Sequence, residues 1–465
     1  MGGGVDRLSA LSDDLLRRIL HFVPSKEAAS TSVLSRRWGS LWRSSGAVNL
    51  AAGEAFARAA AAALAAAEAP VTRLTLRAHT DGGDYSTIGQ FLCRGRGWDT
   101  HVDVIGAVLS HHKARHVEDL GVTLANASDD AWVFLDGEIG WSQAIYSLVS
   151  LPSSETLRVL DLTRCHLEPL ALPRLATLRL RFCSVPHKYV HALVDAAPEL
   201  ATVHLESVFF MLPPELRYLA RFDHSRSVPV DTEESALCFR FRAVTTLVLA
   251  LCGREEQGQA QPRARGNSSA WGIEIDAPRL RSFQYKGLLR RLLLRSAAPD
   301  LARVDLHFLQ DKPRQGECED KETARVLFWQ FMQNFTSARA LKLKMNHDLK
   351  EIAAVGKARR AALLHAFPSV ERLELEGVHR PTSKTAAVAV ANLLHCCPAV
   401  RDLTLRLSTV PPHSWKGTEY WRPFLGRKDR SDNSKSIDRF TRRSSKATTI
   451  VMEESSGDYG YDDVP

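Results

Sequence analysis

The sequence predicts a mixed α/β fold in which a small three-helix module precedes an elongated repeat domain. Two patterns predict it. Apolar residues recur at helical spacing between residues 5 and 50. Further along, a six-residue core of the form L-x-x-L-x-L recurs through the chain. We divide the chain into the helical module (5–50), an Ala-rich connecting helix (51–70), the repeat domain (71–410) and a C-terminal tail (411–465), basic and then acidic and largely disordered.

The sequence at the beginning of the helical module carries the signals of a helix N-terminus. Ser12 stands at the N-cap position, and two aspartates follow in the first turn, where the helix dipole favours acids. Pro24 ends this helix, and Ser25 is placed to cap the next one. A third apolar stripe runs to Trp42. Three helices of this size cannot bury all these side chains among themselves, so the surplus apolar surface predicts a protein partner.

These residues resemble the F-box, the motif that docks a protein onto the Skp1-type adaptor of a cullin-RING ubiquitin ligase. The run V-L-S-R-R-W (33–38) is its most specific part. The matching residues are Leu8, Leu11, Asp14, Leu15, Leu16, Ile19, Leu20, Pro24, Val33, Leu34, Ser35, Arg36, Trp38, Leu41 and Trp42. Ser12 departs from the family, which usually has a proline there that packs against the adaptor, so the strength of docking stays open. The alternative is an ordinary helical cap on a larger domain.

Eleven copies of L-x-x-L-x-L follow, at irregular spacings of 18 to 46 residues. They lie at 71–76, 117–122, 157–162, 175–180, 200–205, 244–249, 280–285, 301–306, 338–343, 370–375 and 400–405. Six copies have a proline two residues before the first apolar position: Pro173, Pro198, Pro278, Pro299, Pro368 and Pro398. Such a proline ends a preceding helix and forces an extended lead-in.

Helical segments precede several of these prolines, at 187–197, 323–335, 359–367 and 385–397. A repeating order of helix, proline turn and short strand is the plan of a leucine-rich-repeat solenoid, with a parallel sheet on the concave face and helices and loops on the convex face. Insertions are expected at 253–270 and 311–321. The alternative is chance clustering of leucine in another α/β protein.

An F-box followed by irregular leucine-rich repeats resembles the plant F-box/leucine-rich-repeat proteins, especially the grass members. The resemblance implies a non-catalytic substrate receptor of an SCF (Skp1–cullin–F-box) ubiquitin ligase, which binds a Skp1-like adaptor, through it a cullin, and an unknown target protein. The relatives normally continue into further apolar repeat material at the C-terminal end, so a terminal repeat is expected to be lacking here.

Two sets of site residues follow from this resemblance and from the x positions of the repeats. The helix bundle and its adaptor-facing surface would be formed by Leu11, Leu15, Leu16, Ile19, Leu20, Pro24, Val33, Trp38 and Trp42. The target would meet strand residues on the concave face, namely Arg179, Arg181, His204, Glu206, Arg303, Asp305, His307, Lys342 and Lys344. Their mixed signs predict a patterned polar partner. The sequence does not divide the first set into helix-bundle core and contact surface.

Composition and motifs argue against several other classes of function. Hydrophobic and charged contents of 45% and 25% are typical of a globular protein. The sequence has no long uncharged apolar run and no apolar leader, so we expect no membrane segment. The eight cysteines form no C-x-x-C pair, so we expect buried reduced thiols and a cytoplasmic or nuclear location. His112 and His116 lack the glutamate of a zinc-hydrolase motif, and we expect no cofactor, metal or catalytic site.

The net charge of +8 is concentrated in residues 421–448. This segment carries interspersed acids and few aromatic residues, so a nucleic-acid-binding or membrane-surface role is a lesser alternative. A second alternative is an adaptor-bound interaction scaffold that promotes no ubiquitination, which the departure at Ser12 allows.

Overall fold

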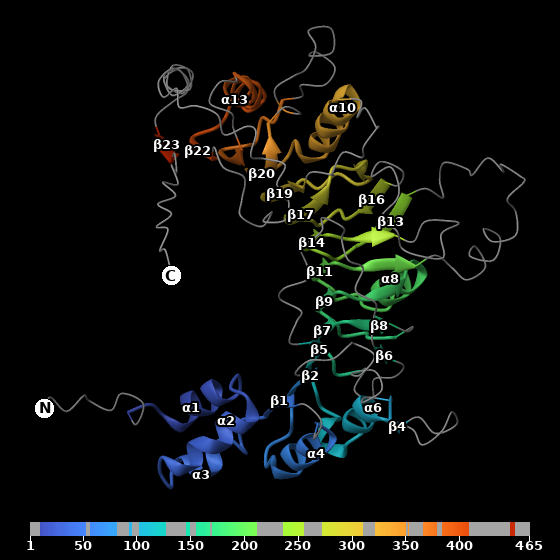
Figure 1. Cartoon of the computed structure of the whole chain (residues 1–465), viewed down its shortest axis with the longest axis vertical. Coiled ribbons are helices and arrows are strands. Elements are labelled where there is room, and N and C mark those ends of the chain that lie inside the picture. Colours follow the sequence, from blue (N-terminus) through green and yellow to red (C-terminus); the bar gives the residue numbers. More distant parts are fainter. Residues whose placement is uncertain are drawn as a thin grey trace, which may run out of the picture. The chain divides into compact units, whose positions relative to one another are not determined.

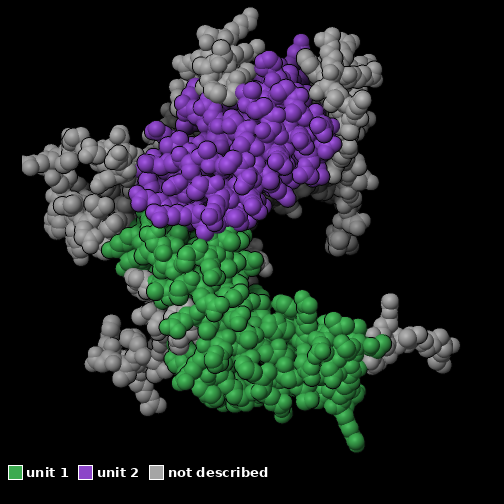
Figure 2. Space-filling model, turned by 180° about the vertical axis from the view of Figure 1, so that it is seen from behind, with its two compact units in different colours: residues 1–133, 140–225, 252–262 green, residues 134–139, 226–251, 263–465 purple. Residues whose placement is uncertain are grey.

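The computed structural model describes residues 10–52, 56–80, 93–94, 102–126, 146–148, 155–167, 170–211, 236–254, 272–309, 321–349, 352, 366–378, 384–408 and 447–451. The chain divides into two compact units, coloured separately in Figure 2. Unit 1 comprises residues 1–133, 140–225 and 252–262, and unit 2 comprises 134–139, 226–251 and 263–465.

Unit 1 opens with the helical module, whose apolar core is small and well defined. It contains α1 (Asp13–Leu20), α2 (Ser25–Ser30), the 3-10 helix η1 (Thr31–Val33) and α3 (Trp38–Leu41). Leu16, Leu20, Ala28, Trp38 and Leu41 form its core. Ser12 caps α1 by accepting a hydrogen bond from the backbone N–H of Leu15.

The predicted capping role of Ser25 is wrong. Pro24 occupies the N-cap position of α2, and Ser25 is the first helical residue. The Ser25 hydroxyl accepts from the backbone N–H of Asn49 at 2.8 Å, which ties α2 to the first strand of the sheet.

The main sheet of unit 1 is parallel throughout (Figure 1). In spatial order its strands are β1 (Ala47–Ala52), β2 (Arg73–Thr80), β5 (Asp119–Asn126), β7 (Val159–Thr163), β9 (Thr177–Arg181) and β11 (Thr202–Glu206). Buried and partly exposed residues alternate along them, so one face of each strand packs into the core. Within the Ala-rich segment the described helix, α4, spans Phe56–Ala66.

A second, smaller parallel sheet accompanies the main sheet of unit 1. Its strands are β6 (Tyr146–Leu148), β8 (Cys165–Leu167), β10 (Ser184–Pro186), β12 (Phe209–Met211) and β15 (Gly253–Arg254). Residues with positive φ, Arg164, Phe182 and Ser207, follow β7, β9 and β11 and turn the chain from one sheet to the other. The short strands β3 (Cys93–Arg94) and β4 (Val102–Asp103), the helices α6 (Val104–Leu109) and α8 (His187–Asp195), and the 3-10 helix η2 (His112–Ala114) complete the unit.

Unit 2 repeats the same arrangement. Its main sheet pairs β14 (Thr246–Ala250), β17 (Ser282–Leu288), β19 (Arg303–Leu309), β20 (Ala340–Asp348), β21 (Arg372–Val378), β22 (Asp402–Ser408) and β23 (Ala447–Val451) in parallel. Its second sheet contains β13 (Ala236–Arg240), β16 (Gly272–Asp276) and β18 (Leu292–Leu294). The helices described over their full length in this unit are α10 (Lys321–Met332), η3 (Gln333–Phe335) and α13 (Thr385–Cys396).

The predicted parallel sheet is confirmed, because every L-x-x-L-x-L copy enters a strand of a main sheet at its third residue. Two predicted helical segments contain α8 and α13, and a third (323–335) overlaps α10, which begins two residues earlier. Most of the fourth (359–367), of the two insertions and of the tail lies outside the described residues. No helix in the described part of the chain is long and apolar enough to cross a membrane.

Free thiols lie inside both units. Cys165, Cys183, Cys396 and Cys397 are buried. Burial raises the pKa of the Cys183 and Cys397 thiols to about 12 and that of Cys396 to about 11. The thiolate is the reactive form, so these thiols are unreactive at neutral pH.

We expect iodoacetamide at pH 8 to leave Cys183, Cys396 and Cys397 unmodified in the native protein and to modify them fully in guanidinium chloride. Peptide mass spectrometry measures both states on one sample. Rapid native alkylation of Cys183 would contradict its burial.

Candidate functional site

An exposed apolar stripe runs along α1 and just beyond its end. Leu15, Ile19 and Phe22 lie at positions i, i+4 and i+7, which share one helix face. Leu15 and Ile19 are about half exposed, and Phe22 is 63% exposed. Val33 and Leu34, at the end of η1, are still more open, with Val33 88% exposed. Large apolar side chains that are this exposed to solvent are typical of a protein–protein interface.

The structure divides the predicted adaptor set into three groups. Leu16, Leu20 and Trp38 are buried in the core of the module, so they support the surface from below. Leu11 and Trp42 are partly buried against that core. The exposed members are Leu15, Ile19, Pro24 and Val33. The site prediction omitted Phe22 and Leu34. The i+7 spacing from Leu15 could have identified Phe22.

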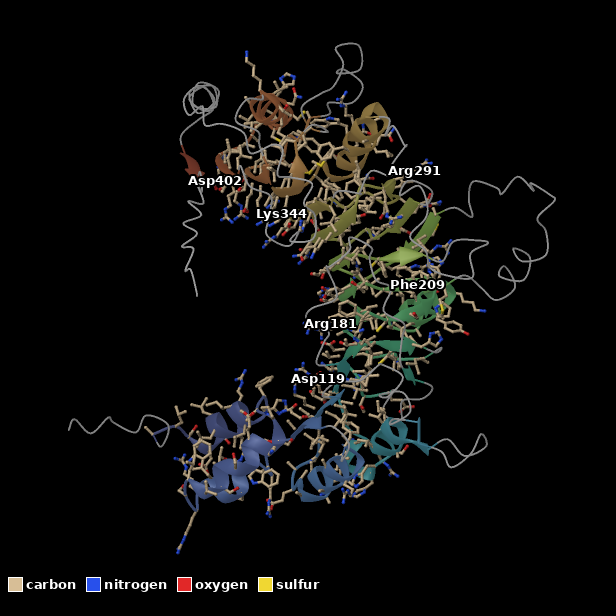
Figure 3. The ribbon with its side chains drawn as sticks, in the orientation of Figure 1. Asp119, Arg181, Phe209, Arg291, Lys344 and Asp402 are labelled. Atoms are coloured by element: carbon tan, nitrogen blue, oxygen red, sulfur yellow. The ribbon has the colours of Figure 1, made fainter. Side chains whose placement is uncertain are left out.

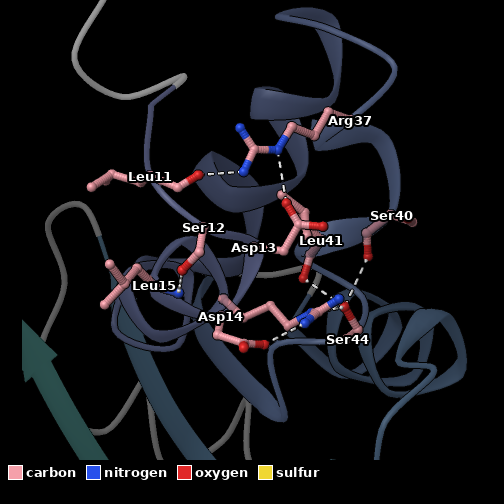
Figure 4. A network of polar contacts seen from close by, with 10 residues as sticks. Leu11, Ser12, Asp13, Asp14, Leu15, Arg37, Ser40, Leu41 and Ser44 are labelled. Atoms are coloured by element: carbon pink, nitrogen blue, oxygen red, sulfur yellow. Dashed lines mark hydrogen bonds and ion pairs between the residues drawn. The ribbon is translucent and has the colours of Figure 1, made fainter.

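A polar network fixes α1 against the rest of the module (Figure 4). Arg37 donates to the Asp13 carboxylate at 2.7 Å and to the Leu11 carbonyl. On α1 itself, Arg17 bonds Asp14 at 2.8 Å and the Ser44 hydroxyl at 3.2 Å. Because these polar side chains carry the internal bonds, the apolar stripe of α1 remains available to a partner.

The module is joined firmly to the main sheet of unit 1. The Asn49 side-chain amide on β1 donates to the carbonyls of His21 and Val23, at 2.9 and 3.0 Å. Arg73 on β2 lies over the Phe22 ring, 5.1 Å from its centroid. These contacts fix the position of α1 relative to β1 and β2.

The partly exposed face of the main sheet in unit 1 carries four predicted target residues, of which Figure 3 labels Arg181. The Arg181 guanidinium bonds the Asp161 carboxylate at 2.8 Å, and Arg179 approaches the same carboxylate at 3.9 Å. On β11, His204 Nε2 lies 3.8 Å from the Glu206 carboxylate. Burial lowers the pKa of His204, and the Glu206 charge opposes that shift.

The corresponding face of unit 2 holds the other five predicted target residues, of which Figure 3 labels Lys344. Arg303 lies 3.8 Å from Asp305 on the same strand. Lys342 bonds Glu374 at 2.9 Å, and Lys344 bonds Glu376. His307 lies on β19 beside Lys344 in the strand register. None of the nine predicted target residues is buried.

Comparison with known proteins identifies the helical module. Residues 8–47 match the family described as the F-box domain. An F-box/FBD/LRR-repeat protein of Arabidopsis thaliana is 60% identical over 38 residues, 8% of this chain and 9% of the relative. An FBD-associated F-box protein of the same plant is 59% identical over 39 residues, 8% of this chain and 10% of the relative. A putative FBD-associated F-box protein of that plant is 52% identical over 44 residues, 10% of this chain and 24% of the relative.

The chain therefore carries an F-box domain, and its relatives support a plant F-box protein. The first two matches span about a tenth of each relative's length.

Proposed function

We propose that this chain is the substrate-recognition subunit of an SCF-type ubiquitin ligase. F-box proteins are in general non-catalytic receptors that dock on the SCF adaptor, and here the F-box domain would bind a Skp1-like adaptor and through it a cullin. The observation that carries the proposal is the exposed apolar stripe of Leu15, Ile19 and Phe22 on the matched domain. The reaction would proceed at the charged enzyme held by the partners, and this chain would contribute proximity.

We further propose that residues 71–410 form a leucine-rich-repeat solenoid of the kind found in plant F-box proteins, including the grass members. A longer repeat signature supports it. Residues 157–167 read L-x-x-L-x-L-x-x-C-x-L, and 175–185 repeat the pattern with valine at the end. The Cys183 thiol donates to the Leu162 carbonyl of the neighbouring repeat at 3.5 Å. One strand of each sheet per repeat, linked by a positive-φ residue, also fits a solenoid turn.

The target would bind to the partly exposed faces of the main sheets, where the polar strand residues gather. A cytoplasmic or nuclear location accompanies this role, because the adaptor and cullin act there. The proline-to-serine difference at Ser12 would lower adaptor affinity without preventing docking, since Ser12 still caps α1.

The test is a binding measurement between the full chain and a purified Skp1-type adaptor by isothermal titration calorimetry, followed by capture of a cullin on the complex. We expect the adaptor to bind with a negative heat-capacity change, which reports burial of apolar surface. Absence of adaptor binding by the folded chain would refute the receptor role.

A further inference from the structure

One cross-strand row on the sheet face of unit 1 holds two arginines and two threonines across four strands, and Glu206 on β11 lies opposite the last of them. The strand register aligns Arg77 on β2 with Thr123 on β5, Thr123 with Thr163 on β7, and Thr163 with Arg181 on β9. We call this set the Arg–Thr row. Neighbouring strands lie about 4.8 Å apart, so the two arginines stand roughly 14 Å apart at their Cα atoms.

Asp161, the acid beside the Arg–Thr row, is recessed below the two arginines that it pairs with. Asp161 is the carboxylate partner of both Arg179 and Arg181, so one negative charge faces two guanidinium groups. The Arg179 side chain is 50% exposed, whereas the Asp161 side chain is 21% exposed. The short Asp161 carboxylate thus holds two longer cationic side chains, and the groups nearest to solvent around Asp161 are basic.

Several polar groups of the Arg–Thr row are left without partners. Arg77 is exposed and has no ion-pair or hydrogen-bond partner among the described residues. The Nε of Arg181 and the hydroxyl of Thr163 are buried atoms that also lack a hydrogen-bond partner. These two atoms are closed off from solvent, so the exposed Arg77 guanidinium is the unpaired group that a docking ligand can reach.

We propose that the Arg–Thr row, with Arg179 beside it, is a docking surface for an extended acidic segment of a partner protein. This inference rests on the proposed function, because it assigns a chemical class to the target. An extended chain advances about 3.3 Å per residue, so acidic side chains at i and i+4 are about 13 Å apart and match the separation of Arg77 and Arg181. The segment would cross β2, β5, β7 and β9, with its carboxylates on the arginines and its backbone over the threonines.

A protein segment fits this surface better than a nucleic acid does. The threonine hydroxyls and the recessed Asp161 match a partner with separate, spaced negative charges. A continuous phosphate backbone would also meet the carboxylates of Asp161 and Glu206. Among the described residues, no aromatic ring lies in the Arg–Thr row to stack on a base.

The experiment measures fluorescence anisotropy of three labelled probes with the full chain bound to the Skp1-type adaptor. The probes are a 12-residue Gly/Ser peptide with glutamate at every fourth position, the same peptide with glutamine there, and a 12-nucleotide single-stranded RNA. We expect the glutamate peptide to bind at least about tenfold more tightly than the glutamine peptide, and its binding to weaken as salt rises.

The variant Arg77→Gln with Arg179→Gln should weaken binding of the glutamate peptide by about five- to tenfold. It leaves the 2.8 Å bond between Arg181 and Asp161 in place, so the fold is kept. The matched control, Arg58→Gln with Arg295→Gln, removes the same charge from α4 and from the residue that follows β18, and should change binding by less than about twofold.

Equal binding of the two peptides, an equal effect of the two double variants, or tighter binding of the RNA would each overturn the proposal. So would no measurable binding of the glutamate peptide. Adaptor binding is recorded on the same samples. If it persists while peptide selectivity fails, the receptor role stands and only the acidic target class is lost.

Discussion

Replacing both Leu15 and Ile19 with aspartate is expected to abolish adaptor binding, with a loss of affinity of at least about 100-fold. Full burial of one large aliphatic side chain contributes roughly 1.5–3 kcal/mol. Because Leu15 and Ile19 are already about half buried in the free chain, the two positions together account for about 1.5–3 kcal/mol. A charge placed in an apolar interface adds a desolvation cost. Both side chains are exposed in this structure, so the fold of the module should be unchanged.

The measurement is calorimetric titration of the variant with the adaptor, with the thermal melt recorded beside it. Leu293→Asp with Val388→Asp is the matched control, since it changes two exposed aliphatic residues outside the F-box domain. This control should bind the adaptor like the wild type. If the α1 variant bound the adaptor within about threefold of the wild-type affinity, the apolar stripe would not be part of the adaptor interface.

The repeating strands could be predicted because their signal is local. Alternation of apolar and polar residues in LRVLDL and LATLRL specifies which face of each strand is buried, and Leu160, Leu162, Leu178 and Leu180 are fully buried. The three-residue strands of the second sheet were missed, because a run such as Cys165–Leu167 is too short to show a period. The signal that could have identified this strand is Cys165, which extends the pattern at 157–167 to L-x-x-L-x-L-x-x-C-x-L.

The division of the module into core and surface could not be predicted. Leu15 and Leu16 are adjacent and chemically identical, yet the first is half exposed and the second fully buried. Their difference depends on how α1 packs on α3 and is braced through Arg37, which are contacts across more than twenty residues of sequence. The strand register could be predicted by aligning the repeats, because Asp161 and Arg179 are both the fifth residue of their copies and lie opposite each other. The diagonal bond from Arg181 to Asp161 depends on side-chain conformation, which the repeat does not specify.

Phe331→Ala is expected to destabilise unit 2 by about 3–5 kcal/mol, the usual cost of a large cavity in a well-packed core. Phe331 on α10 is buried, and its ring lies 5.2 Å from Tyr285 on β17, 5.2 Å from Phe308 on β19 and 5.8 Å from Phe335 in η3. This cluster attaches the helix to two strands of the main sheet. Its loss should therefore loosen β17 and β19 together.

Hydrogen exchange is the suitable readout, because a chain with two compact units need not unfold in one step. The slowest amides of β17 and β19 should exchange about 10²- to 10³-fold faster in the alanine variant. Phe331→Leu keeps most of the volume and should cost about 1 kcal/mol or little more. Since the F-box domain lies in unit 1, adaptor binding by the alanine variant should be unchanged. Protection of β17 equal to that of the wild type would show that the aromatic cluster does not hold α10 to the sheet.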